Sequence, residues 1–208
     1  MTKIFLTLGS WLALMAAAAA GIIIDDFSAH PDNTTATFSA PNLGRNPTFL
    51  RQPGLEHVLG GNRSASLFAE SHIPLTFSFD AEKKLGILTL EKLATGRATL
   101  SYLGGNLGEA RDLDTDFTAD GAKAIVITFA SAPSTGTLAI TVYSKAKFQT
   151  FALPIKGASP VIFPFTAFNG IDFQHIDGVT LEVQTAKPIN KKLAYEISRI
   201  ETASPGRK

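Results

Sequence analysis

The 208-residue sequence contains no cysteine, and its single tryptophan and both methionines (Met1, Trp11 and Met15) fall within the first 20 residues. Without cysteine the chain can form neither a disulfide framework nor a thiolate metal site, and a cysteine nucleophile is excluded. A domain built from the rest of the chain must be held by its hydrophobic core. The roughly 188 residues after position 20 are enough for one such core.

The sequence also lacks a strong excess of positive or negative charge. The chain has 19 Lys and Arg against 18 Asp and Glu, and the loss of Lys3 with an N-terminal leader would leave 18 of each. Nucleic acids and anionic membrane surfaces attract proteins that carry a basic patch or a high positive charge. We therefore expect no nucleic-acid partner.

The N-terminus has the pattern of a secretory signal peptide. Lys3 precedes an apolar run over Ile4–Met15, and Ala16–Ala20 supply the small residues of a cleavage site. The run is shorter than the roughly 20 apolar residues of a membrane-spanning helix. We predict a secreted or periplasmic monomer without a transmembrane anchor after cleavage. Its chain divides into a signal peptide (1–20), one domain (21–202) and a disordered tail (203–208).

Most informative segments alternate between apolar and polar residues, which is typical of strands with one face in a core. The clearest examples are Ile73–Phe79, Ile125–Phe129, Thr137–Tyr143 and Val179–Gln184. Turn signals separate them, and after the leader no segment shows the 3.6-residue apolar period of a long helix. The sequence predicts an all-β antiparallel sandwich of about ten strands. Ser28–Gln52 is rich in Pro, Ser, Thr and Asn, and we interpret it as a long connection.

The pair Gly60-Gly61 allows two interpretations. It could wrap its backbone around a phosphate, but phosphate loops need a following helix. Here the following segment, Arg63–Phe68, has the two-residue alternation of a strand and not the pattern of a helix. We predict a tight turn that leads into a strand beginning at Arg63.

Catalytic patterns are weak. The four histidines are dispersed and no Gly-x-Ser-x-Gly motif occurs, so we expect no catalytic triad. Glu70, Asp80, Glu91 and Glu182 are the carboxylates that a glycoside hydrolase could use in a pair. Such enzymes usually hold sugars on aromatic rings, and this chain has few outside its expected core. We expect a non-enzyme with no catalytic residues, with hydrolysis kept as an alternative.

Asp25 and Asp26 follow the apolar residues Ile22–Ile24 at the start of the domain. Adjacent residues on a strand point to opposite faces, so one of the two carboxylates should face the core. A buried carboxylate is costly unless it meets a cation or strong hydrogen-bond donors. Ca²⁺ is one alternative, which would make Asp25 and Asp26 metal ligands. An ion pair with an arginine such as Arg63 is the second alternative, and it is the one that we favour. A simple N-terminal turn is the third.

Several motifs together resemble secreted bacterial proteins with a galactose-binding-like jelly roll. They are Ile24-Asp25-Asp26-Phe27, Val58-Leu59-Gly60-Gly61-Asn62-Arg63, Ala98-Thr99-Leu100-Ser101-Tyr102-Leu103-Gly104, Asp116–Ala122 and Phe165-Thr166-Ala167-Phe168. The first two are also similar to the jelly roll of the complex I intermediate-associated protein 30 family. The resemblance implies a jelly-roll sandwich. Related domains tend to close with an acidic residue where this chain has Ser198, which leaves Glu196 as the candidate third calcium ligand.

The function that we expect is a secreted, non-catalytic binding module for carbohydrate or for another cell-surface component. The alternative is a structural or protein-interaction component of an extracellular or envelope assembly. The partner would accordingly be a glycan or an extracellular protein. Tyr102 and Tyr143 are the candidate ligand-binding rings.

Overall fold

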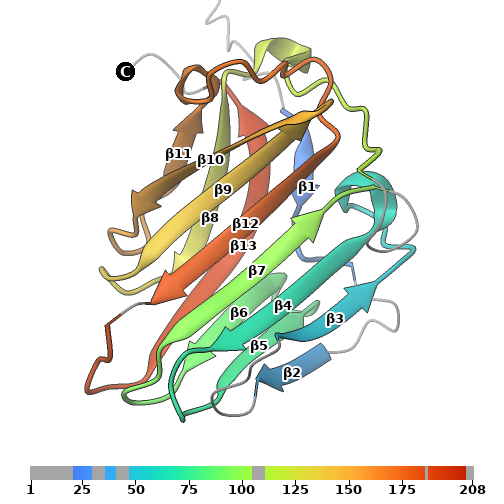
Figure 1. Cartoon of the computed structure of the whole chain (residues 1–208). Helices are drawn as coiled ribbons and strands as arrows, with labels where there is room; N and C mark the ends of the chain where they lie inside the picture. The colour runs from blue at the N-terminus through green and yellow to red at the C-terminus, as the bar shows by residue number, and fades with distance from the viewer. Residues whose placement is uncertain (1–20, 30–35, 41–46, 105–110, 186, 205–208) are drawn as a thin grey trace, which may run out of the picture.

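The alternating segments fold into strands of two antiparallel sheets (Figure 1). The structure is a computed structural model, and it describes residues 21–29, 36–40, 47–104, 111–185 and 187–204. Within this part of the chain the regular elements are 13 strands and three short 3₁₀ turns. The predicted all-β sandwich is confirmed.

The strands divide seven to six between the two sheets. Sheet A contains β1 (Ile23–Asp25), β2 (Ala36–Ala40), β5 (Leu75–Asp80), β6 (Leu85–Leu90), β8 (Ala124–Ser131), β11 (Val161–Pro164) and β13 (Leu193–Ala203). Sheet B contains β3 (Thr48–Gln52), β4 (Arg63–Ala69), β7 (Gly96–Tyr102), β9 (Thr137–Ser144), β10 (Lys147–Pro154) and β12 (Gly178–Thr185). The strand order is β11-β8-β13-β6-β5-β2 in sheet A and β10-β9-β12-β7-β4-β3 in sheet B.

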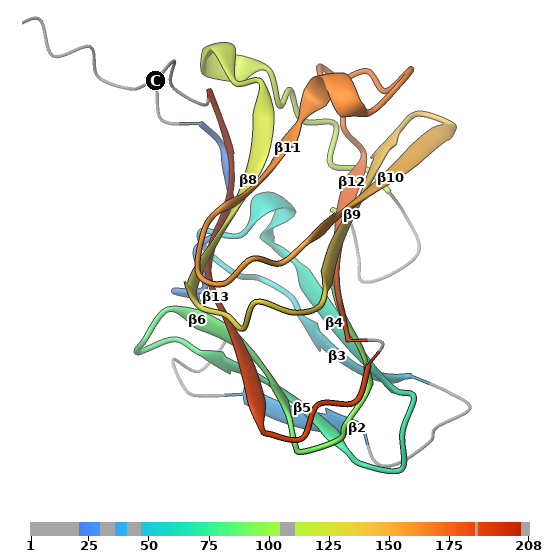
Figure 2. The same cartoon turned by 90° about the vertical axis from the view of Figure 1, so that its left-hand side faces the viewer.

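The two sheets form separate layers, as the view from the side shows (Figure 2). Successive residues of a strand point to opposite faces, so the apolar residues of each strand line the space between the layers. One such inward row crosses sheet B through Ala65, Leu100, Leu181, Ile140 and Phe151. Burial of each large apolar side chain contributes about 1.5–3 kcal/mol, and this core replaces the missing disulfides.

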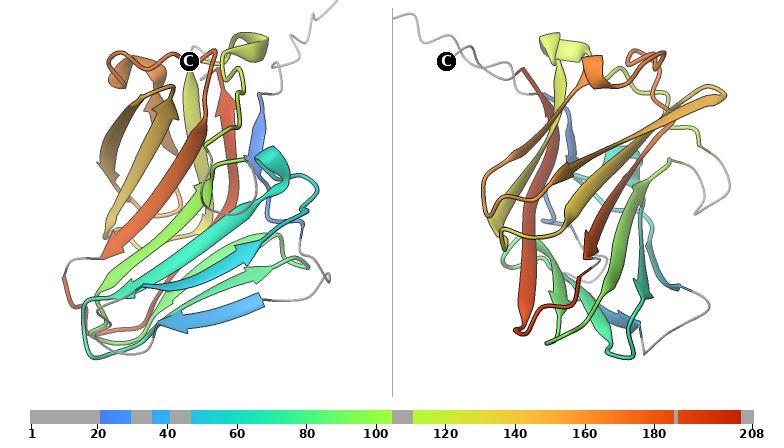
Figure 3. Two further views of the ribbon diagram at one scale, coloured as in Figure 1. Left: turned by 45° about the vertical axis from the view of Figure 1, so that its right-hand side comes forward. Right: turned by 60° about the vertical axis from the view of Figure 1, so that its left-hand side comes forward.

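Strand β13 organises sheet A because it is long enough to have three partners. It pairs with β8 along Glu196–Ala203, with β6 along Leu193–Ile197, and with β1 at Ile200 and Glu201. The short β1 therefore lies beside the C-terminal half of β13 (Figure 3). This pairing brings Asp25 into the sandwich.

Two details differ from the sequence prediction. The described residues form 13 strands where about ten were expected, and two of them, β2 and β3, lie within Ser28–Gln52, which we interpreted as a connection. Both are edge strands of five residues, too short to show a clear alternation. Ala203, assigned to the tail, is the last residue of β13. The signal peptide at 1–20 and the tail residues 205–208 lie outside the described residues.

The glycine pair forms a 3₁₀ turn at Leu59–Gly61 that leads into β4 at Arg63, as predicted. Gly60 has φ +70°, and a Cβ there would lie 2.4 Å from the Leu113 side chain. Both the left-handed conformation and the close packing require glycine at this position. The neighbouring Val58 bridges to Asp25, so the turn abuts β1.

Candidate functional site

An arginine is buried between the two sheets. The Arg63 side chain, from β4, is 1% exposed, and its Nη1 lies 2.7 Å from Oδ2 of the fully buried Asp25 on β1. The same guanidinium donates from Nε to Gln52 and from Nη2 to the carbonyl of Ala29. Its planar group also stacks 3.8 Å from the centre of the Phe79 ring. The ion pair therefore connects sheet A to sheet B.

Tyr102 completes this buried cluster. Its hydroxyl donates to Oδ2 of Asp25 at 2.8 Å. Burial raises the pKa of Tyr102 well above its ordinary value, so the hydroxyl stays protonated and remains a donor. Burial also raises the pKa of Asp25, against the opposing effect of Arg63. The ring of Tyr102 is closed to solvent, so its prediction as a ligand-binding residue is wrong.

The three candidate calcium ligands are not brought together. Asp25 accepts hydrogen bonds from Arg63, Tyr102 and the Phe27 amide. Asp26 accepts from the hydroxyl and amide of Ser28. Glu196 is half-buried and alternates with the inward Tyr195 and Ile197, so it lies on the outward face of sheet A. Across the described ranges, no group of three or more His, Asp or Glu side chains could hold a metal ion.

The outward face of sheet B carries a row of hydroxyl groups, which we call the hydroxyl row. It takes one residue from each of five neighbouring strands, in the order Thr150, Thr141, Thr180, Ser101 and Ser64. Thr141 and Thr150 hydrogen bond to each other at 2.8 Å, and Thr180 donates to Ser101 at 3.3 Å. The row spans about 19 Å, because neighbouring strands lie about 4.8 Å apart. Figure 1 looks onto these strands.

Exposed aromatic rings stand at both edges of the same face. Phe148 on β10 is 63% exposed and Phe49 on β3 is 61% exposed, which makes them the two most exposed large hydrophobic side chains of the described residues. Phe148 packs on Tyr143, whose ring is covered by the guanidinium of Arg111 at 4.0 Å. The two rings therefore mark the two edges of one face of sheet B.

This face carries few charges. Arg97 on β7 stacks on Phe68 with its guanidinium carbon 4.9 Å from the ring centre, and its Nε lies 3.8 Å from Glu182 on β12. Among the described residues, Glu182 is the single carboxylate on the six strands of sheet B. Glycosidases of the common kinds need two carboxylates flanking the bond that they cleave. The described strands of sheet B carry no second carboxylate to complete such a pair.

The other carboxylates considered for hydrolysis are distributed elsewhere. Asp80 ends β5 and binds Lys83 at 2.9 Å, while Glu91 follows β6 and binds Lys192 at 2.6 Å. Both strands belong to sheet A, and Glu70 follows β4 at the end of its strand. The four residues therefore do not form one cluster.

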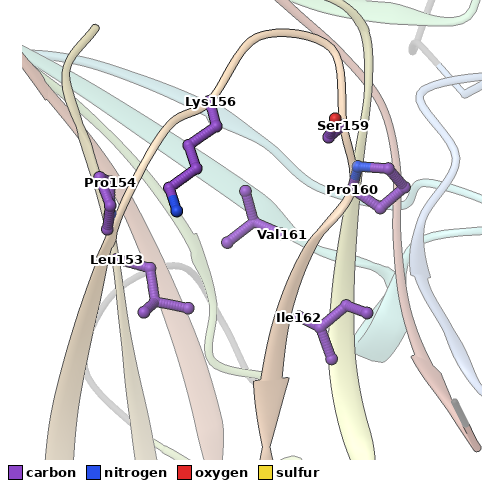
Figure 4. Close-up of a pocket in the computed structure, with 7 residues that line it drawn as sticks. All are labelled: Leu153, Pro154, Lys156, Ser159, Pro160, Val161 and Ile162. Carbon is purple, nitrogen blue, oxygen red and sulfur yellow. The ribbon is translucent and has the colours of Figure 1, made fainter. Parts of the chain in front are cut away.

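Two pockets lie near the borders of the sheets. One, of about 260 Å³, lies between the end of β10 and the start of β11, where the Lys156 side chain points between Pro154 and Val161 (Figure 4). The other, which we call the end pocket, has a volume of about 190 Å³ and adjoins the outward face of sheet B. It is lined by Thr135, Gly136, Thr137, Gln184, Thr185 and Lys187.

The residues of the outward face were mostly missed by sequence reasoning. Of the rings on this face, only Tyr143 was named as a candidate from the sequence, and Phe49 and Phe148 were not. The available signal was positional: Thr141 and Tyr143 alternate with the buried Ile140 and Val142, which marks the polar set as one face. The hydroxyl row could not be predicted in this way, because it depends on which strands are neighbours in the sheet, and the sequence does not show the strand order.

Comparison with known proteins gives only distant structural similarities. No protein-family model and no curated protein matches it. Among solved structures, it is similar to the family 11 carbohydrate-binding module of the cellulosomal cellulase Lic26A-Cel5E of Clostridium thermocellum, at 12% identity and a TM-score of 0.41, over 92% of this chain and 99% of that one. A family 29 carbohydrate-binding module from Piromyces equi has 14% identity and a TM-score of 0.34, over 82% and 91%. A functional assignment must therefore come from this chain's own residues.

Over the described residues, no helix has the length and apolar character needed to cross a membrane.

Proposed function

We propose that the protein is an exported, non-catalytic carbohydrate-binding module that holds an extended glycan across the outward face of sheet B. The observation that supports it is the hydroxyl row between two exposed edge rings. Sugar rings present hydroxyls that exchange hydrogen bonds with serine and threonine, and apolar faces that pack on aromatic rings. This face supplies both kinds of contact.

The geometry suits a chain more than a single sugar. Phe148 and Phe49 occupy the two edge strands, so about 24 Å separates them across the sheet. That distance exceeds the size of one sugar ring and accommodates an oligosaccharide of several units. We further propose that the segment 1–20 directs export, which would bring the domain to extracellular or envelope glycans.

The test is binding of the exported chain to a panel of plant, microbial and animal polysaccharides by affinity electrophoresis. With a polysaccharide that binds, Phe49→Ala and Phe148→Ala should each weaken affinity by about 5- to 30-fold, since truncating an interface aromatic costs about 1–2 kcal/mol. Both rings are exposed, so the folded state should be unaffected.

Ile162→Ala is the matched control. Ile162 is 42% exposed and lies on β11 of sheet A, so its loss should leave glycan affinity unchanged. Failure to bind any polysaccharide would contradict the proposal and favour the structural or protein-interaction alternative. Equal losses for the control and the two phenylalanine variants would contradict the location of the site.

A further inference from the structure

We infer that the end pocket selects glycans with an anionic substituent, a carboxylate or a sulfate, and that Lys187 and Arg97 recognise it. The inference rests on the proposed glycan-binding function and names the class of ligand. It starts from the chemistry of the pocket lining, which contains an ammonium group, an amide and hydroxyl groups, and no carboxylate.

The polar groups of this pocket have spare hydrogen-bonding capacity. Within the described part of the chain, the side chains of Thr137, Gln184 and Lys187 have no hydrogen-bond or ion-pair partner. Lysine and the glutamine amide supply donors to an anion, and the threonine hydroxyl can donate as well. A volume of about 190 Å³ leaves room for one sugar ring with its substituent.

Arg97 stands beside the pocket. The register pairs Thr137 with Gln184 and Gln184 with Arg97, so these three residues form one outward row across β9, β12 and β7. Arg97 stacks on Phe68 and lies 3.8 Å from Glu182, a distance too long for a hydrogen bond. Its guanidinium donors are therefore available, in an orientation fixed by the ring, for a bidentate contact to an oxyanion.

The pocket is also held in shape from the other sheet. The buried Tyr195 of β13 donates its hydroxyl to the Thr135 carbonyl at 2.9 Å, and burial raises its pKa to about 12. Gly136 has φ +89°, and a Cβ there would lie 2.7 Å from the Tyr195 hydroxyl oxygen. The Ile155 amide donates to the Gly136 carbonyl at 3.1 Å. These contacts preorganise the loop that borders the pocket.

The experiment compares anionic polymers with neutral forms of the same polymers. The probes are polygalacturonate for carboxylate and λ-carrageenan for sulfate, against fully methyl-esterified polygalacturonate and desulfated carrageenan. We expect the intact chain to bind at least one anionic polymer about tenfold or more tightly than its neutral form. The preference should shrink as salt rises. The two polymers distinguish carboxylate from sulfate.

Variants then locate the preference. Arg97→Gln combined with Lys187→Gln should reduce affinity for the anionic polymer to that for the neutral form. Arg199→Gln combined with Lys192→Gln removes the same two charges from elsewhere and should leave the preference intact, which separates local recognition from net charge. Glu182→Gln should strengthen anionic binding, because it removes the one carboxylate beside Arg97 on sheet B.

The outcomes separate this inference from the proposed function. Equal binding of the anionic and neutral forms would overturn the selection of anions and leave glycan binding standing. Equal effects of the two double variants would also overturn it. Binding to none of the polysaccharides tested would count against both.

Discussion

The two sheets share one core, yet their outward faces differ in chemistry. Sheet B presents the hydroxyl row and the rings of Phe49, Phe68, Tyr143 and Phe148. In the described strands of sheet A, every aromatic ring belongs to the inward set. This difference is the reason why we propose sheet B, and not sheet A, as the ligand-binding sheet.

The two sheets also differ in how each holds an exposed arginine. Arg97 on sheet B and Arg199 on sheet A are similarly exposed, at 43% and 41%, and each has a glutamate neighbour. Arg199 donates from Nε to Glu201 at 2.7 Å, whereas the shortest contact of Arg97 to Glu182 is 3.8 Å. Arg199 therefore uses its Nε donor within sheet A, whereas Arg97 makes no hydrogen bond to Glu182.

The largest expected effect comes from breaking the Arg63–Asp25 ion pair. This pair joins the two sheets, so its loss should destabilise the whole sandwich and both of its outward faces. Asp25→Ala should lower the free energy of unfolding by about 3–5 kcal/mol, since it leaves the Arg63 charge buried without its partner. Urea denaturation followed by circular dichroism measures the change. The double variant Asp25→Leu with Arg63→Met should be more stable than Asp25→Ala alone. An Asp25→Ala protein as stable as the wild type would contradict the structural role of the pair.

The smallest expected effect is on the free energy of unfolding when either of the two exposed arginines is replaced. Arg97→Gln and Arg199→Gln should each change the free energy of unfolding by less than about 1 kcal/mol, as exposed ion pairs do. Arg199→Gln should cost more, because it breaks a hydrogen bond of 2.7 Å. The same urea titrations decide this. A greater cost for Arg97→Gln would mean that Arg97 serves stability and is not free for a ligand.

The sequence predicted the interior better than the surface. Alternation in Leu75–Asp80 or Thr137–Ser144 records which residues are buried, because burial acts on every second residue of a strand. The inward-facing carboxylate next to Ile24 and the turn before Arg63 could be anticipated for similar local reasons. Edge strands such as β2 and β3 could not, since they are short and half solvated.

The candidate site depends on neighbours that are distant in sequence. Ser64, Ser101, Thr141 and Thr180 are ordinary outward residues until the strand order sets them in one row. Tyr102 was misassigned because a tyrosine at an inward position looks the same in sequence as one on a binding face. Its hydroxyl is satisfied by Asp25, a contact that only the packing of β1 against the sandwich creates.

The most direct test of glycan binding on sheet B is an amide NMR titration of the exported chain with an oligosaccharide cut from the polysaccharide that binds best. The account predicts that the perturbed amides are those of Ser64, Ser101, Thr141 and Thr180 and their strand neighbours, with sheet A unaffected beyond β13 contacts to the end pocket. Perturbations centred on the outward residues of sheet A, such as Thr128 and Glu196, would contradict it.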